Sequence, residues 1–185
     1  ESVVASDVDK GQAVYPAPVV LGDVEVVVVL HVDDFASTGD PVAVAKYRKH
    51  LHERFTMTGG PIKEYYGLNC VVKDGVATLS GEGNIGRMLK KLSVVTVPPG
   101  VTTPMAEDLV LERQEGECTD KALHSRYRTV VGMVLHLAVC VRPDVAAAAR
   151  ALSSHLQHPT KKHLAAAMRV VFYLANTRKL ALTFG

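Results

Sequence analysis

Two adjacent carboxylates are the residues of this sequence best suited to chemistry. Asp33 and Asp34 follow a valine-rich run that ends in His31 and Val32. Two neighbouring ionised carboxylates repel each other, and apolar surroundings raise the cost of keeping both charged. A divalent cation removes that cost, and carboxylate oxygens are preferred ligands of Mg²⁺. The pair therefore predicts a metal site, with a solvated acidic turn as the alternative.

Basic side chains in the last third of the chain form a second group of candidates. Residues 1–120 contain 11 lysines and arginines against 18 acidic residues, a net charge of −7, whereas residues 121–185 contain 10 against one, a net charge of +9. A basic block favours a polyanionic partner; a solvated bundle exterior and an electrostatic fit between the two parts are the alternatives. The predicted phosphate-binding residues are Arg142, Arg150, Lys161, Lys162 and Arg169.

A glycine pattern at residues 81–86 matches the spacing G-x-G-x-x-G of dinucleotide-binding proteins. Such a site needs a parallel strand in front of the glycines. Here the preceding strand follows Asp74-Gly75, a dipeptide typical of antiparallel hairpins. We therefore interpret the match as accidental and predict no bound dinucleotide.

Three histidines near the end of the sequence are candidate metal ligands. His155, His158 and His163 lie close together, but Pro159 interrupts any helix that they would share. Roles at helix ends and on the surface are the preferred interpretation.

Cysteine content and hydropathy exclude several classes of protein. The three cysteines are widely spaced and form no C-x-x-C pair, so neither a disulfide framework nor a zinc ribbon is indicated. The apolar run Val26–Leu30 is far shorter than the ~20 residues of a membrane-spanning helix. We therefore expect an intracellular protein, in the cytoplasm, the nucleus or an organelle assembly, with no membrane partner.

The elements expected to position these residues are of mixed type. A buried strand leads into Asp33, and Asp40-Pro41 reads as the start of a helix that the glycines and proline of residues 59–61 stop. A hairpin is predicted from two strands, residues 65–72 and 76–80. A short helix over residues 84–92 follows.

The rest of the chain is predicted to be helical after a loop at residues 94–120. Apolar residues at helical spacing predict a long helix over residues 123–138, and Pro143-Asp144 and Pro159-Thr160 each begin another. Residues 181–184 read as a final extended piece. The fold class is α+β, with predicted domains 1–93 and 121–185 joined by an acidic, proline-containing linker.

Ordered motifs in this sequence resemble those of reverse transcriptases of copia-type LTR retrotransposons. The stretch VVVLHVDDFASTGD resembles the strand–turn–strand that carries the Tyr-Val-Asp-Asp box of that family. The family's later signatures follow in order over residues 12–185. They are matched by FTMTGG, YYGLNCVV, LSGEGNIGRML, TTPM and YRTVVGMVLHLAVCVRPDVAAAARALSSHLQHPTKKHLAAAMRVVFYLANT.

The resemblance implies an RNA-directed DNA polymerase that uses Mg²⁺ or Mn²⁺ and an RNA or DNA template–primer. Asp33 and Asp34 would be palm carboxylates, His31 would lie by the primer end where the family has Tyr or Phe, and the basic helical bundle would be the thumb and connection. The family's third metal-binding Asp and its fingers lie upstream of the box. We therefore expect a partial palm that binds the metal weakly and is inactive by itself. The alternative is a non-catalytic remnant that serves a larger assembly as a structural or RNA-binding subunit.

Overall fold

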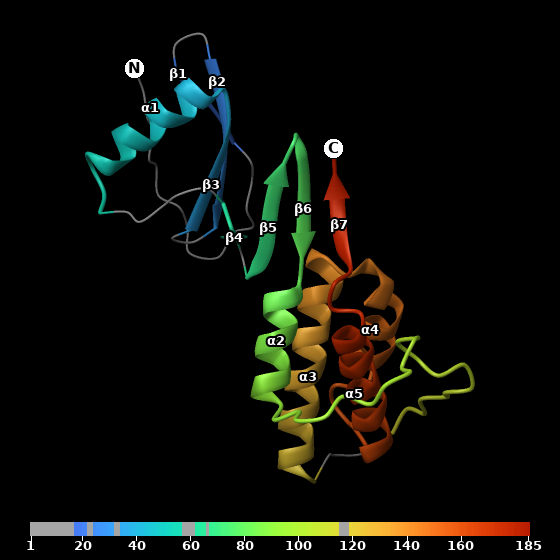
Figure 1. The fold of residues 1–185 in the computed structure, drawn as a ribbon. Helices are drawn as coiled ribbons and strands as arrows, with labels where there is room; N and C mark the ends of the chain where they lie inside the picture. The colour runs from blue at the N-terminus through green and yellow to red at the C-terminus, as the bar shows by residue number, and fades with distance from the viewer. Residues whose placement is uncertain (1–16, 22–23, 32–33, 57–61, 66, 115–118) are drawn as a thin grey trace. The chain divides into compact units, whose positions relative to one another are not determined.

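The computed structural model of the chain describes residues 17–21, 24–31, 34–56, 62–65, 67–114 and 119–185. Its contacts divide the chain into two compact units, Glu1–Tyr66 and Gly67–Gly185 (Figure 1). Each unit has its own hydrophobic core. The architecture is α+β, as predicted. None of the helices in the described ranges is long and apolar enough to cross a membrane.

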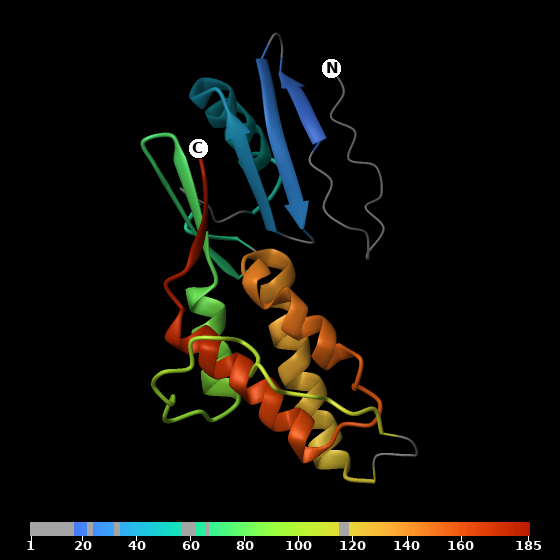
Figure 2. The same ribbon diagram turned by 90° about the vertical axis from the view of Figure 1, so that its right-hand side faces the viewer.

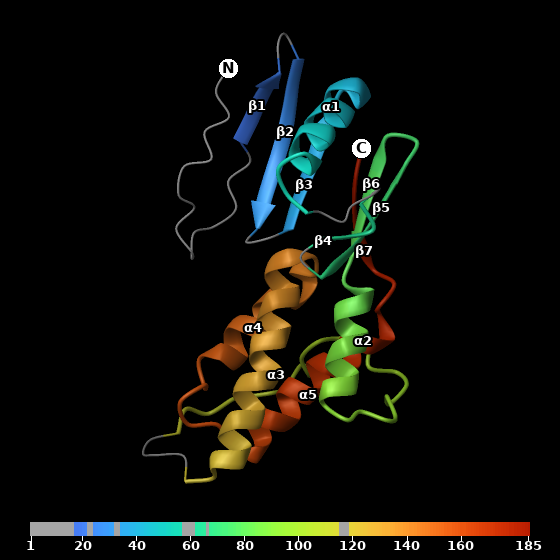
Figure 3. The same ribbon diagram turned by 90° about the vertical axis from the view of Figure 1, so that its left-hand side faces the viewer.

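The first unit is built on an antiparallel sheet with strand order β1-β2-β3. Its strands are β1 (Ala17–Leu21), β2 (Val24–His31) and β3 (Asp34–Gly39). Because side chains alternate along a strand, Val26 and Val28 lie on one face of β2. Both are buried against Ala43 of α1 (Pro41–His52), and Figure 3 shows this helix beside β2 and β3.

Asp40 starts α1, as the sequence predicts. Its carboxylate accepts hydrogen bonds from the backbone N–H groups of Val42 and Ala43, both at 3.0 Å, and Pro41 occupies the first helical turn. The helix ends at His52, before the predicted stop at residues 59–61, which lie outside the described residues. The short strand β4 (Glu64–Tyr65) follows.

The predicted hairpin opens the second unit. β5 (Leu68–Lys73) and β6 (Val76–Ser80) pair in antiparallel register around Asp74 and Gly75. Both turn residues have positive φ, 52° and 81°, which a tight hairpin turn of this kind requires. β7 (Ala181–Phe184) is the predicted final extended piece, and it pairs antiparallel to β6.

The helices of the second unit share one core. They are α2 (Glu82–Lys91), α3 (Lys121–Cys140), the 3₁₀ turn η1 (Pro143–Val145), α4 (Ala146–Ser153) and α5 (Lys161–Asn176). Figure 2 shows α3, α4 and α5 lying side by side, and contacts join each pair of them. Their inward faces bury small and branched apolar residues, among them Val130, Val134, Leu152, Ala167, Val170 and Leu174.

The division into units differs from the predicted domains. Residues 67–93 were expected to belong with the first strands, but Leu68, Ile85 and Met88 are buried in the same core as α3 and α5. The predicted linker contains no helix or strand in its described part, residues 94–114 and 119–120. This segment nevertheless packs on the core of the second unit through its apolar side chains, which are Val94, Val101, Met105, Leu109 and Leu111.

Candidate functional site

The aspartate pair of the first unit falls where β2 is followed by β3, and Asp34 is the first residue of β3. β2 ends at His31, β3 begins at Asp34, and these two residues are register partners. Buried valines of β2 hold the hairpin against α1, so its position is fixed by the unit's own core. Asp33 lies outside the described residues, as do the side chains of His31 and Asp34. The hairpin therefore agrees with the predicted strand–turn–strand, while the metal site stays a prediction.

The described residues offer no alternative metal site. A search of the described residues finds no group of three or more His, Cys, Asp or Glu side chains that could hold a metal ion. The predicted absence of a dinucleotide site is consistent with the topology. β6, which leads into residues 81–86, is antiparallel to both β5 and β7, so the parallel unit that such a site needs is not formed there.

The structure places most of the predicted phosphate-binding residues at the surface of the second unit. Arg150 is exposed on α4, and Lys161 and Lys162 are exposed in the first turn of α5. Arg169 follows Lys162 by seven residues, which places both on the same side of α5. Its Nη2 atom donates to Thr103 Oγ1 at 3.1 Å, so Arg169 also joins the loop between α2 and α3 to α5.

Arg142 lies elsewhere, and this corrects its predicted role. The residue is 1% exposed, and its guanidinium donates to both carboxylate oxygens of Asp144, at 2.9 Å from Nε and 2.7 Å from Nη2. It also donates to the backbone oxygen and the hydroxyl of Thr177, at 3.2 and 2.6 Å. A side chain engaged in this way joins the end of α3 to the end of α5 and is not available to a phosphate.

Asp144 is the counter-charge of this buried network. Its Oδ2 atom also accepts from the Tyr173 hydroxyl at 2.8 Å. Burial raises the pKa of the carboxyl, but hydrogen bonds from Arg142 and Tyr173, together with the Arg142 charge, outweigh it and hold the pKa below its usual value. Asp144 therefore stays ionised opposite the guanidinium at neutral pH.

His163 occupies a helix end, as predicted, but it is buried and does not lie on the surface. It is 1% exposed and forms a capping box with Thr160. Its Nδ1 atom accepts from the Thr160 N–H at 3.0 Å, so the proton of the neutral ring is on Nε2, which donates to the backbone oxygen of Glu112 at 3.1 Å. His155 stacks on this ring with centroids 4.1 Å apart.

These histidines are held in the neutral form. Burial lowers the pKa of His163, and the Lys162 charge, together with the repulsion that a proton on His155 would add, lowers it further against the opposing effect of the Glu112 carbonyl. Burial likewise lowers the pKa of His155, with a contribution from Arg113. The signal that the sequence offered for His163 is the spacing Thr-x-x-His, which matches a capping box with histidine in place of Glu or Gln.

Comparison with known proteins finds relatives among transposon polyproteins. The chain is 31% identical over 169 residues to the retrovirus-related Pol polyprotein from transposon TNT 1-94 of Nicotiana tabacum, covering 86% of the chain and 13% of the polyprotein. It is 33% identical over 155 residues to that from transposon RE1 of Arabidopsis thaliana, covering 82% and 10%. A putative transposon Ty5-1 protein of Saccharomyces cerevisiae is 26% identical over 165 residues, covering 88% of the chain and 53% of that protein.

The other comparisons add no match. No family model matches the sequence, and no solved structure matches the fold. The chain spans about a tenth of the length of the two plant polyproteins. Its similarity to them extends over most of its own length, which supports a retrotransposon origin. The chain is therefore related to a segment of the Pol polyproteins of copia-type transposons.

Proposed function

We propose that this chain belongs to the reverse transcriptase region of a copia-type Pol polyprotein and carries part of its palm and thumb. The observation that carries the proposal is the β2–β3 hairpin, whose strands end and begin at His31 and Asp34 around an Asp-Asp pair. The similarity to transposon Pol polyproteins supports the same assignment. The chemistry proposed for the whole polymerase is metal-dependent nucleotidyl transfer onto a primer end.

In this proposal Asp33 and Asp34 hold Mg²⁺ or Mn²⁺. The donor set fits such an ion, because both side chains are hard oxygen ligands and follow a strand that is anchored in a core. A bound divalent ion supplies charge neutralisation at the phosphates of an incoming nucleotide. In this proposal the chain's own contribution would be to present the two carboxylates close to His31, whose ring would lie beside the primer end.

Nucleic-acid binding is proposed for four cations of the second unit, of which three are exposed and Arg169 is half-buried. Arg150, Lys161, Lys162 and Arg169 would contact the phosphate backbone, without base-specific contacts. Arg142 is omitted from this set because its charge is already compensated inside the bundle. Each phosphate contact releases about one counterion, so the affinity should fall steeply with salt.

The binding half of the proposal is tested by fluorescence anisotropy with an RNA–DNA duplex at several salt concentrations. Lys162→Gln should weaken binding and reduce the slope of log affinity against log salt by about 1. Lys73→Gln, at an exposed position on the β5–β6 hairpin, is the matched control and should change neither quantity. Equal slopes for the two variants would contradict the assignment of this surface.

The catalytic half is tested by primer extension on an RNA template with Mg²⁺ or Mn²⁺, using the parent polymerase that contains this chain. Asp33→Asn should abolish extension while leaving duplex affinity unchanged. If Asp33→Asn extends primers at the parental rate, the catalytic assignment is wrong. If duplex binding is retained but even the unmodified protein extends no primer, the alternative function, a non-catalytic RNA-binding or structural subunit, is favoured.

A further inference from the structure

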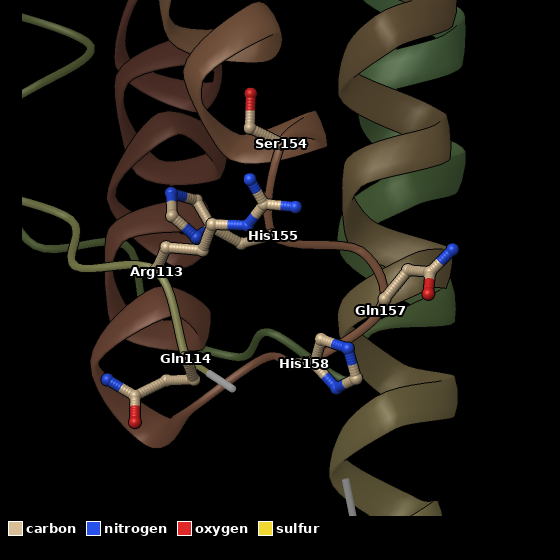
Figure 4. Close-up of a pocket in the computed structure, with 6 residues that line it drawn as sticks. All are labelled: Arg113, Gln114, Ser154, His155, Gln157 and His158. Atoms are coloured by element: carbon tan, nitrogen blue, oxygen red, sulfur yellow. The ribbon is translucent and has the colours of Figure 1, made fainter. Parts of the chain in front are cut away.

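The loop between α2 and α3 is held on α5 by side-chain hydrogen bonds at three points. Asn176 donates to Pro98 O at 3.0 Å, Arg169 donates to Thr103 Oγ1 at 3.1 Å, and His163 donates to Glu112 O at 3.1 Å. Figure 2 shows this loop beside α5, and Figure 4 shows Arg113, the next residue along it, beside His155. The loop is therefore attached to the bundle at several places along its described length.

Thr103 is the residue of this loop that is best suited to covalent modification. Thr103 and Pro104 form the only Ser-Pro or Thr-Pro pair in the sequence. Such a pair is the minimal target of proline-directed protein kinases. Proline disfavours the helical conformation for the residue before it, so the acceptor is presented in an extended form. Thr103 is exposed and lies in neither a helix nor a strand, so a kinase active site can reach it.

Two hydrogen bonds place the Thr103 hydroxyl. It donates to Met105 O at 2.9 Å and accepts from Arg169 Nη2 at 3.1 Å. A phosphate ester at this oxygen would lose the first bond, because the hydroxyl proton is gone, but its charge would face the guanidinium that already donates to the same oxygen. Arg169 is half-buried on α5, so a cation is in position before any phosphate is attached.

We propose that Thr103 is a phosphorylation site whose phosphate is held by Arg169. A proline-directed kinase would transfer the γ-phosphoryl group of a nucleoside triphosphate to Thr103. A bond forms between Oγ1 and phosphorus, the bond from that phosphorus to the leaving nucleoside diphosphate breaks, and the hydroxyl proton passes to the catalytic base of the kinase. The product carries a charge of about −1.5 to −2 at neutral pH. Arg169 would then donate charge-assisted hydrogen bonds in place of its one bond to a neutral hydroxyl.

Two carboxylates of the same loop oppose this arrangement. Glu107 and Asp108 follow Thr103 by four and five residues, and both are exposed. Water and salt screen exposed charges, whereas Arg169 contacts the acceptor oxygen directly. We therefore expect the phosphate to strengthen the attachment of the loop to α5.

Phosphorylation would also regulate the nucleic-acid surface proposed above, and this consequence rests on that proposed function. Arg169 is one of the four cations of that surface. A phosphate paired with Arg169 would compensate its charge and add a negative charge beside the bound backbone. The duplex affinity of the phosphorylated chain should therefore fall, and the slope of log affinity against log salt should become shallower by about 1.

The modification is tested by incubating the full chain with a mitogen-activated protein kinase and ATP, followed by mass spectrometry of its peptides. The phosphate should be found on Thr103. Thr103→Ala should remove it, whereas Thr102→Ala, at the neighbouring exposed threonine that no proline follows, should retain it. Circular dichroism checks that both variants are folded. An unphosphorylated Thr103, or equal phosphate incorporation in Thr103→Ala, would overturn the proposal.

The role of Arg169 is tested by ³¹P NMR of the phosphorylated chain as a function of pH. A neighbouring cation favours the doubly charged phosphate, so the second pKa of the phosphate should be at least about 0.5 lower in the unmodified chain than in Arg169→Gln. Arg128→Gln, at an exposed position on α3, should leave this pKa unchanged. Equal phosphate pKa values in the unmodified chain and Arg169→Gln would overturn the pairing. If these values differ as expected but phosphorylation leaves duplex affinity unchanged, the modification site is supported and the proposed nucleic-acid role of Arg169 is wrong.

Discussion

Removing the Asp144 charge should be among the most damaging single changes in the second unit. Asp144→Asn leaves the Arg142 guanidinium, which is 1% exposed, without a counter-charge and weakens bonds of 2.7 and 2.9 Å. Breaking one side of a buried ion pair costs about 3–5 kcal/mol. The Asp144 side chain is 34% exposed, so water relieves part of this cost, and we expect about 3 kcal/mol. In a domain of this size that lowers the melting temperature by roughly 10 °C.

Urea unfolding followed by circular dichroism measures this loss, and a second substitution isolates its cause. Arg142→Met in the Asp144→Asn background removes the orphaned charge and fills the space with an apolar chain. The double variant should be more stable than Asp144→Asn alone. The reasoning fails if Asp144→Asn costs less than about 1 kcal/mol, or if Arg142→Met makes that variant still less stable.

The pH dependence of the same pair has a defined sign. Because the pKa of Asp144 is lower in the folded protein than in the unfolded chain, its contribution to stability is complete above about pH 5. It is lost as the pH falls below about 4 and through the folded pKa. Asp144→Asn should therefore lose less stability on acidification than the unmodified protein. Plots of the free energy of unfolding against pH that run parallel for the two proteins would contradict this.

Two further substitutions test the interior of the bundle. Tyr127→Phe should lower the free energy of unfolding in urea by about 1 kcal/mol, because it removes the hydroxyl bond to Leu152 O while the bond from His155 remains. Burial raises the pKa of Tyr127 to about 12, so the titration step near that pH should be absent from the absorbance curve of this variant. The folded-state pKa of His163 is lowered, so stability should fall as the pH drops below about 6.5. His163→Gln can keep the capping box and should lose less stability over the same pH range. An equal loss of stability in this variant would show that His163 does not cause the pH dependence.

Short sequence signals correctly predicted helix starts and a hairpin turn, where one or two residues determine the backbone conformation. Asp40 before Pro41 predicted the start of α1, and Asp74-Gly75 predicted the β5–β6 turn. Thr160 begins α5 in the same way. These features depend on contacts within a few residues, which the sequence displays directly.

Burial of polar residues could not be predicted in this way. Arg142 was expected at the surface because most arginines are exposed, and its partner Thr177 lies far along the chain, at the end of α5. Asp144, two residues away, was the one local clue. The loop before α3 was predicted to be a linker because it is rich in proline, threonine and acidic residues, although its apolar residues pack on the core.

We propose above that Asp33 and Asp34 form a metal-binding pair and not merely an acidic turn. The most direct test is a titration of the full chain with Mn²⁺, followed by electron paramagnetic resonance. Asp33→Asn should weaken Mn²⁺ binding at least about tenfold, because it removes a charged ligand. Asp74→Asn, which removes a carboxylate from the other hairpin turn, should leave binding unchanged. Equal affinities for the unmodified chain and Asp33→Asn would contradict the claim.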